Sequence, residues 1–227
     1  DGGKTALNKG DKYDYHNIGE VVWAGLFAQG EFTSEMFDAF LSGSLTYEGY
    51  RYLVPEGYST TNHANFLSNP LYGPDFVKRT ASDRVNLMPW SIKAGASYKF
   101  LDYNNFFFNA GYFTRAPKFA GAFLNYSTQV NKHLTNEKIM TVELGYGFQN
   151  EVFRANLNGY FTKWDDRFLR RNSVLEKNQY WNFRNLSALH KGIELDLEYR
   201  PAKELRLTGM FSLGDWRWGG ISKYDIY

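Results

Sequence analysis

The chain has 227 residues, of which 43% are hydrophobic and 19% aromatic, and its formal net charge is +2. So small a charge argues against a nucleic-acid partner, which would call for a strongly basic surface. There is no cysteine, which excludes disulfide bonds and thiol chemistry. No apolar run approaches the roughly 18 residues of a membrane-spanning helix, so any insertion into a membrane must use strands closed into a barrel.

Four segments, taken in chain order, alternate apolar and polar side chains with the two-residue period of a β-strand. Each segment is divided by a short turn and is therefore expected to form a β-hairpin. The predicted hairpins lie near residues 18–52, 91–115, 138–164 and 191–218. The clearest strand places Met140, Val142 and Leu144 on one face, opposite Thr141 and Glu143. One face of each strand is apolar and the other could contact water.

The predicted strands are long enough to cross a membrane. Strands of soluble proteins average about 5 to 6 residues, whereas a membrane-spanning strand needs roughly 9 to 11, and these runs reach that length. Aromatic residues gather near the ends of the apolar faces, as in the girdles of outer-membrane barrels. We therefore predict an all-β fold, an antiparallel transmembrane β-barrel, with a soluble aromatic-rich β-sandwich as the alternative.

Long connections separate the hairpins, at residues 53–89, 116–137 and 165–190. Bacterial barrels place long loops outside and short turns on the periplasmic side. If the short turns here are periplasmic and the long connections are outside, the first predicted strand starts at the outer surface and the eighth strand ends there. An intact barrel of this class has both termini on the periplasmic side. We therefore expect eight consecutive strands of a larger barrel, because open sheet edges could not lie alone in lipid.

Short motifs in the second half of the chain occur in a fixed order. They are 112–117 (YFTRAP), 136–138 (NEK), 142–146 (VELGY), 160–167 (YFTKWDDR), Asn185 followed by 191–195 (KGIEL), and 199–201 (YRP). Across residues 105–218 this ordered set resembles the barrel of TonB-dependent outer-membrane receptors. Asn136 stands where the family often has proline, and 213–218 (LGDWRW) resembles a feature of one branch of the family. Residues 1–90 fit the architecture without a motif.

The resemblance implies a barrel of about 22 strands with an N-terminal plug in its lumen. It also implies import of a scarce or bulky nutrient, such as a siderophore, glycan or peptide, energised through TonB, and a location in the bacterial outer membrane. The implied partners are membrane lipid, the plug and remaining strands, and the TonB complex; the plug and the TonB-contacting segment are expected outside this chain. A surface lipoprotein or a larger outer-membrane assembly is left open as a partner. The alternatives are a non-transporting barrel that is a structural subunit, and a passive porin.

Polar residues on the wet strand faces are expected to face the lumen or the plug. These predicted wall residues are Glu143, Arg154, Asn156, Asn158, Glu194, Asp196, Glu198 and Arg206. For any single one, a generic wet barrel wall is the simpler interpretation, because lumen-facing positions are polar by default. The carboxylates have no histidine or nucleophile beside them in sequence, so we predict no enzyme, no catalytic residue and no cofactor.

Two predicted outer loops carry aromatic and cationic residues that could stack on a ligand and pair with its charge. The candidates are Tyr180, Trp181, Phe183, Arg170, Arg171 and Arg184 in one loop, and Phe119, Phe123 and Tyr126 in the other. An equally weighted alternative to ligand binding is that these rings pack one loop against another or anchor a partner lipoprotein. The histidines, His16, His63, His133 and His190, have no His or Cys partner at metal-ligand spacing, so no metal site is predicted.

Overall fold

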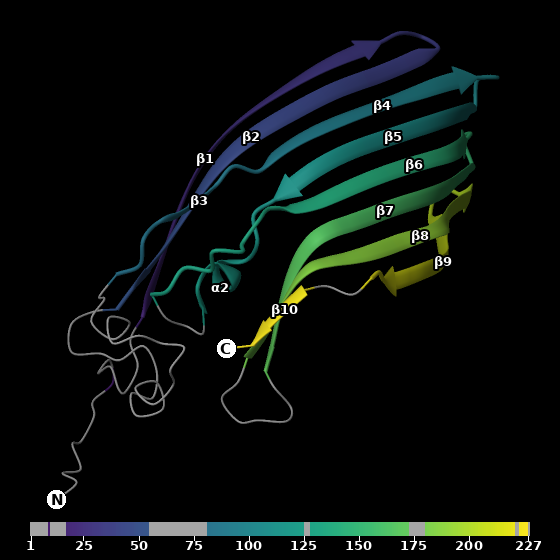
Figure 1. Cartoon of the computed structure of the whole chain (residues 1–227). Helices are drawn as coiled ribbons and strands as arrows, with labels where there is room; N and C mark the ends of the chain where they lie inside the picture. Colours follow the sequence, from purple (N-terminus) through teal and green to yellow (C-terminus); the bar gives the residue numbers. More distant parts are fainter. Residues whose placement is uncertain are drawn as a thin grey trace, which may run out of the picture.

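One antiparallel β-sheet makes up most of the computed structural model (Figure 1), which describes residues 9, 17–54, 81–124, 128–172, 180–220 and 223–226. The long strands are β1 (Ile18–Thr33), β2 (Phe37–Leu53), β4 (Trp90–Phe100), β5 (Asn104–Arg115), β6 (Glu137–Gln149), β7 (Phe153–Asn172), β8 (Tyr180–Ala202) and β9 (Leu205–Trp218). The short elements are β3 (Val85–Leu87), α2 (Phe119–Ala122) and β10 (Lys223–Ile226). No described helix is long and apolar enough to cross a membrane.

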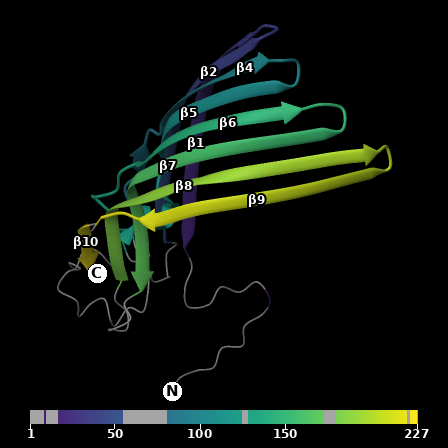
Figure 2. The same ribbon diagram turned by 90° about the vertical axis from the view of Figure 1, so that its right-hand side faces the viewer.

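The long strands follow one another around the sheet in chain order. Each pairs antiparallel with the long strand before it, β3 adds to β2, and β10 pairs with the end of β8 that lies beyond β9. Figure 2 shows the short turns of β4–β5, β6–β7 and β8–β9 at one end of this curved wall. Among the described strands β1 and β9 do not pair with each other, so the barrel is not closed. The predicted eight long antiparallel strands are confirmed.

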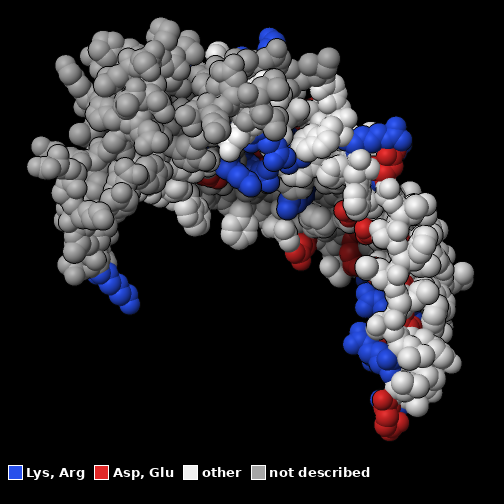
Figure 3. All heavy atoms as spheres, turned by 90° about the horizontal axis from the view of Figure 1, so that it is seen from below, with Lys and Arg blue, Asp and Glu red and all other residues white. Residues whose placement is uncertain are grey.

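The pairing keeps the two faces of the sheet chemically distinct, because directly paired residues lie on the same face. One row crosses β4 to β9 as Ala96, Phe108, Leu144, Gly159, Ile193 and Leu213. A row on the opposite face contains Asn109, Glu143, Tyr160, Gly192 and Gly214. Figure 3 shows acidic and basic side chains along the concave side of the wall. The concave side is the lumen face, and the convex side is the membrane face.

The membrane face carries an apolar belt of membrane thickness. Its outward side chains stay apolar over residues 153–161 of β7 and 205–213 of β9, runs that fit the roughly 9 to 11 residues of a tilted membrane strand. Beyond the belt the same face becomes charged, at Lys163, Lys191 and Asp215. This change marks the outer end of the apolar belt.

Aromatic rings border the belt at both ends. Ring centroids are 5.1 Å apart in the pair Phe100–Phe106 and 6.1 Å apart in Phe148–Phe153 near the short turns, and 5.3 Å apart in Trp90–Tyr112 at the other end. Within the described residues the strands form a single sheet. A β-sandwich would bury one face against a second sheet, so that alternative is wrong.

The third predicted loop, residues 165–190, is strand for most of its length. β7 continues to Asn172 and β8 begins at Tyr180. Register shifts interrupt the pairing between Trp164 and Arg167 and again before Leu169. Both Asp166 and Asn185 have a φ of 56°, the left-handed conformation that short polar residues tolerate. Such bulges move side chains to the opposite face and so break the two-residue period on which the prediction depended.

Candidate functional site

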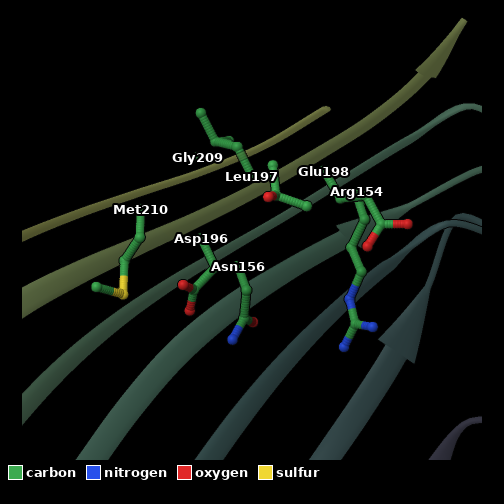
Figure 4. Close-up of a pocket in the computed structure, with 8 residues that line it drawn as sticks. Arg154, Asn156, Asp196, Leu197, Glu198, Gly209 and Met210 are labelled. Carbon is green, nitrogen blue, oxygen red and sulfur yellow. The ribbon is translucent and has the colours of Figure 1, made fainter. Parts of the chain in front are cut away.

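A shallow cavity of about 380 Å³ lies on the lumen face of β7, β8 and β9. Figure 4 shows Arg154, Asn156, Asp196 and Met210 projecting from the same side of the sheet toward it. The cavity therefore combines a cation, a carboxylate and an amide with one thioether. Such a surface suits polar contacts and water more than an apolar ligand.

The predicted wall residues share this face. Strand pairing places Glu143, Arg154, Asn156, Asn158, Glu194, Asp196, Glu198 and Arg206 on the lumen side. Glu198 accepts hydrogen bonds from Arg200 Nε at 2.5 Å and Arg206 Nη2 at 2.6 Å, which fixes its carboxylate at the short-turn end of the wall. Contact of these residues with a plug stays a prediction.

A cluster of aromatic and cationic side chains lies on the same face nearer the outer end. We call it the mouth patch, and its members are Tyr160, Trp164, Arg167, His190, Trp216 and Trp218. Trp164 and Trp218 lie in one row on either side of Ala188. The Arg167 guanidinium lies 4.8 Å from the ring centroid of Trp164 and 5.0 Å from that of Trp218. Cation–π attraction thus holds one cation against two indoles.

Trp216 is held by its neighbours yet exposes its ring. Its Nε1 donates to Tyr160 Oη at 2.9 Å, and the ring centroids of Trp216 and His190 are 6.2 Å apart. A Cβ at Gly214 would lie 2.9 Å from the Trp216 ring, so glycine is needed for this close approach. Trp216 is 67% exposed and Trp218 is 60% exposed. The mouth patch can therefore stack on a flat ring and offer guanidinium N–H groups to an anion.

The described parts of residues 116–136, namely 116–124 and 128–136, fold onto the lumen face beside the mouth patch, and we call this segment the inward loop. Phe123 is 2% exposed, and its ring centroid lies 5.5 Å from that of Tyr52 and 5.1 Å from that of Phe119. Arg170 Nη2 donates to the Phe123 carbonyl at 2.5 Å. The loop, with α2, thus bridges β2 and β7 across the concave side of the wall (Figure 1).

Polar contacts anchor the inward loop as well. Tyr50, beyond the apolar belt, donates from Oη to Glu48 Oε2 at 2.6 Å and lies 3.2 Å from the Pro117 carbonyl. Burial, followed by the hydrogen bond to Glu48, raises the pKa of Tyr50 above its ordinary value, so the phenol stays a neutral donor. Asn131 Nδ2 donates to the Gly121 carbonyl at 3.0 Å. The loop is a packed structural element.

The aromatic ligand candidates of this loop pack inside it. Phe123 is buried, and Phe119 is half-buried with its ring 5.6 Å from that of Tyr50. Arg170 is occupied by the Phe123 carbonyl and by Asn182 Oδ1 at 3.2 Å. All three side chains therefore lie between the inward loop and the strands, in contact with other parts of the protein. Tyr126 lies outside the described residues.

The remaining loop candidates do not form one surface. Arg171 pairs with Trp181 and Leu169 with Phe183, so Arg171, Trp181 and Phe183 share one face. The Trp181 and Phe183 rings are 6.0 Å apart. Alternation places Arg170, Arg184 and the Tyr180 backbone position on the other face. Arg170 contacts the inward loop, so Arg171, Trp181 and Phe183 lie on the face that points away from that loop.

Histidines contribute no cluster to the described part of the chain, in which no three His, Cys, Asp or Glu side chains could hold a metal ion. His16 and His63 lie outside the described residues, His133 is exposed, and His190 belongs to the mouth patch.

The prediction missed the mouth patch, although a signal was present. In the segment 213–218, alternation assigns Trp216 and Trp218 to the wet face with Ser212. The lumen face is polar by default, so two tryptophans on that face are a signal of ligand binding.

Comparison with known proteins finds one matching family and two solved structures of similar fold or sequence. The family described as "TonB dependent receptor-like, beta-barrel" matches residues 2–226. The chain is similar in fold to the solved structure of "Copper transporter OprC", with a TM-score of 0.55 and 18% identity over 86% of this chain and 29% of that one. For the "siderophore receptor PirA from Pseudomonas aeruginosa" the TM-score is 0.44 and the identity 12%, over 88% of this chain and 48% of that one.

No curated protein matches the chain, and the chain spans less than half the length of either solved structure. The family match nevertheless covers nearly every residue, and the curved antiparallel sheet has the two distinct faces that a barrel of this kind requires. The chain therefore belongs to the TonB-dependent receptor family, whose β-barrel it forms in part.

Proposed function

We propose that this chain is the wall and part of the outer mouth of a receptor that imports a scarce or bulky nutrient across the bacterial outer membrane. Import is energised through TonB, by parts of the receptor outside this chain. Family membership supports the general scheme of a barrel, a plug and a TonB contact. The observation that carries the ligand-binding part of the proposal is the mouth patch.

The mouth patch has the chemistry and the position that capture of a ligand needs. Trp216 and Trp218 are mostly exposed on the lumen face of β9, the edge strand of the described sheet, and Arg167 brings positive charge between Trp164 and Trp218. The inward loop beside them is packed and pinned, so the site is largely formed before a ligand arrives, which lowers the ordering cost of binding. A ligand with a flat ring and a negative charge fits this surface best.

Below the mouth patch, the wall residues support a second part of the proposal. Arg154, Asp196 and Asn156 leave a polar, open cavity on the lumen face. A plug seated there would contact hydrogen-bonding groups that water can also satisfy. The plug could therefore separate from the wall without leaving charged groups that lack a hydrogen-bond partner. We propose that these residues contact the plug of the complete receptor.

Truncating the mouth patch should weaken uptake. In the full-length receptor, we expect Trp218→Ala and Arg167→Ala each to raise the half-saturating nutrient concentration about five- to tenfold, because each removes a stacking or cation–π contact. The measurement is growth of wild-type, variant and receptor-deleted strains on limiting iron chelates, glycans and peptides, followed by uptake of the labelled nutrient that the deleted strain cannot use. A protonophore should abolish this uptake.

Trp90→Leu is the matched control, because it removes an indole that is 44% exposed on the membrane face and should leave uptake unchanged. A deleted strain that grows like wild type on every nutrient would contradict import and favour a structural subunit. Uptake that survives the protonophore would instead indicate a passive pore.

A further inference from the structure

A shallow groove of about 810 Å³ lies on the membrane face of β6 to β9. Its floor is Gly159, which is flanked in register by Leu144 and Ile193. A Cβ built on Gly159 would meet only the Leu144 carbonyl at 3.8 Å and the Gly192 carbonyl at 4.0 Å. A larger residue would therefore fit at this position without a clash. With glycine there, the surface is hollowed between the apolar neighbours Leu144 and Ile193.

Charged side chains line the outer end of the same groove. Lys191 and Arg217 share one carboxylate, with Lys191 Nζ 3.8 Å from Asp215 Oδ2 and Arg217 Nε 2.6 Å from Asp215 Oδ1. Two cations on one anion leave a net positive charge at this end. Their side chains are 53% and 74% exposed, so both can still reach a ligand.

The order of these features along the strands matches one kind of molecule. Moving outward, the groove passes from Leu213 and Ile193 to Lys191 and Arg217, at the depth where the apolar belt ends. A membrane lipid presents its acyl chain and its headgroup in the same order. We propose that this groove binds a phosphate-bearing lipid, with an acyl chain over Gly159 and the phosphate at Lys191 and Arg217.

Native mass spectrometry of the delipidated full-length receptor, titrated with phosphatidic acid, tests the proposal. We expect one tightly bound lipid in the wild type. Lys191→Gln with Arg217→Gln should bind it about 30-fold more weakly, since each basic residue near a membrane surface contributes about a fivefold factor. Gly159→Leu, which fills the groove and leaves both cations in place, should weaken binding as well.

Two matched variants control for folding and for charge. Gly43→Leu fills another outward-facing glycine, where a Cβ meets only the Ser91 carbonyl at 3.6 Å, and Lys203→Gln removes a cation from an exposed short turn. Both should bind phosphatidic acid like the wild type. The proposal would be overturned if Gly159→Leu and the Lys191→Gln/Arg217→Gln double variant bound phosphatidic acid as tightly as the wild type. If diacylglycerol binds as tightly as phosphatidic acid, the phosphate makes no contact and the proposal is overturned. If inorganic phosphate binds as tightly as phosphatidic acid, the acyl chain makes no contact and the proposal is overturned as well.

Discussion

Replacing Phe123 with alanine is expected to destabilise the inward loop by about 3–5 kcal/mol, the usual cost of removing a buried phenyl ring. Phe123 is 2% exposed and lies between Tyr52 and Phe119, so the truncation leaves a cavity between loop and wall. Hydrogen-exchange mass spectrometry of the full-length receptor measures the change, as faster exchange confined to residues 116–136.

Phe211→Ala is the control for this experiment. Phe211 is 59% exposed on the membrane face, and its truncation should leave exchange in the inward loop unchanged. Nutrient uptake should fall with Phe123→Ala, because the loop lies beside the mouth patch, even though Phe123 itself is too buried to contact a ligand. If exchange in residues 116–136 is the same in Phe123→Ala and wild type, the loop is not held by this core.

The strand architecture could be predicted because its determinants are local. The alternation of Met140, Val142 and Leu144 with Thr141 and Glu143 is written in five consecutive residues. A slip of one residue in pairing would turn every apolar side chain to the wet face, so the same alternation also excludes every register that is shifted by an odd number of residues. The structure accordingly pairs Leu144 with Phe108 and Gly159, all on the membrane face.

The mouth could not be predicted in the same way, because its determinants are far apart in the chain. Tyr52 of β2 meets Phe123 about 70 residues later, and no local pattern announces that contact. Without it, the sequence left open whether Phe119 and Phe123 contact a ligand or pack against other parts of the protein. Bulges at Asp166 and Asn185 hid the outer part of β7 and β8 for a related reason, since a bulge is set by the pairing partner as well as by the strand itself.

The motifs that carried the family resemblance meet in space. Arg115 closes the motif at 112–117 and Glu137 belongs to the motif at 136–138; they pair across β5 and β6, with Arg115 Nη2 2.5 Å from Glu137 Oε2. The Glu137 side chain is 5% exposed and also accepts the Phe168 N–H at 3.5 Å. Arg115 lies 5.1 Å from the Trp164 ring as well. This ion pair therefore connects the base of the inward loop to the mouth patch.

Arg115→Ala should consequently destabilise the outer end of the wall by about 2–4 kcal/mol, because it leaves a buried carboxylate without its cation. Glu137→Gln should cost only about 1 kcal/mol, since the amide still accepts hydrogen bonds and Arg115, 49% exposed, can turn to water. In the double variant the buried charge is gone, so its loss should be smaller than the sum of the single losses. Hydrogen exchange of β5 and β6 in the full-length receptor measures all three. Additive losses would mean that the two side chains act independently, and that the ion pair does not hold the mouth together.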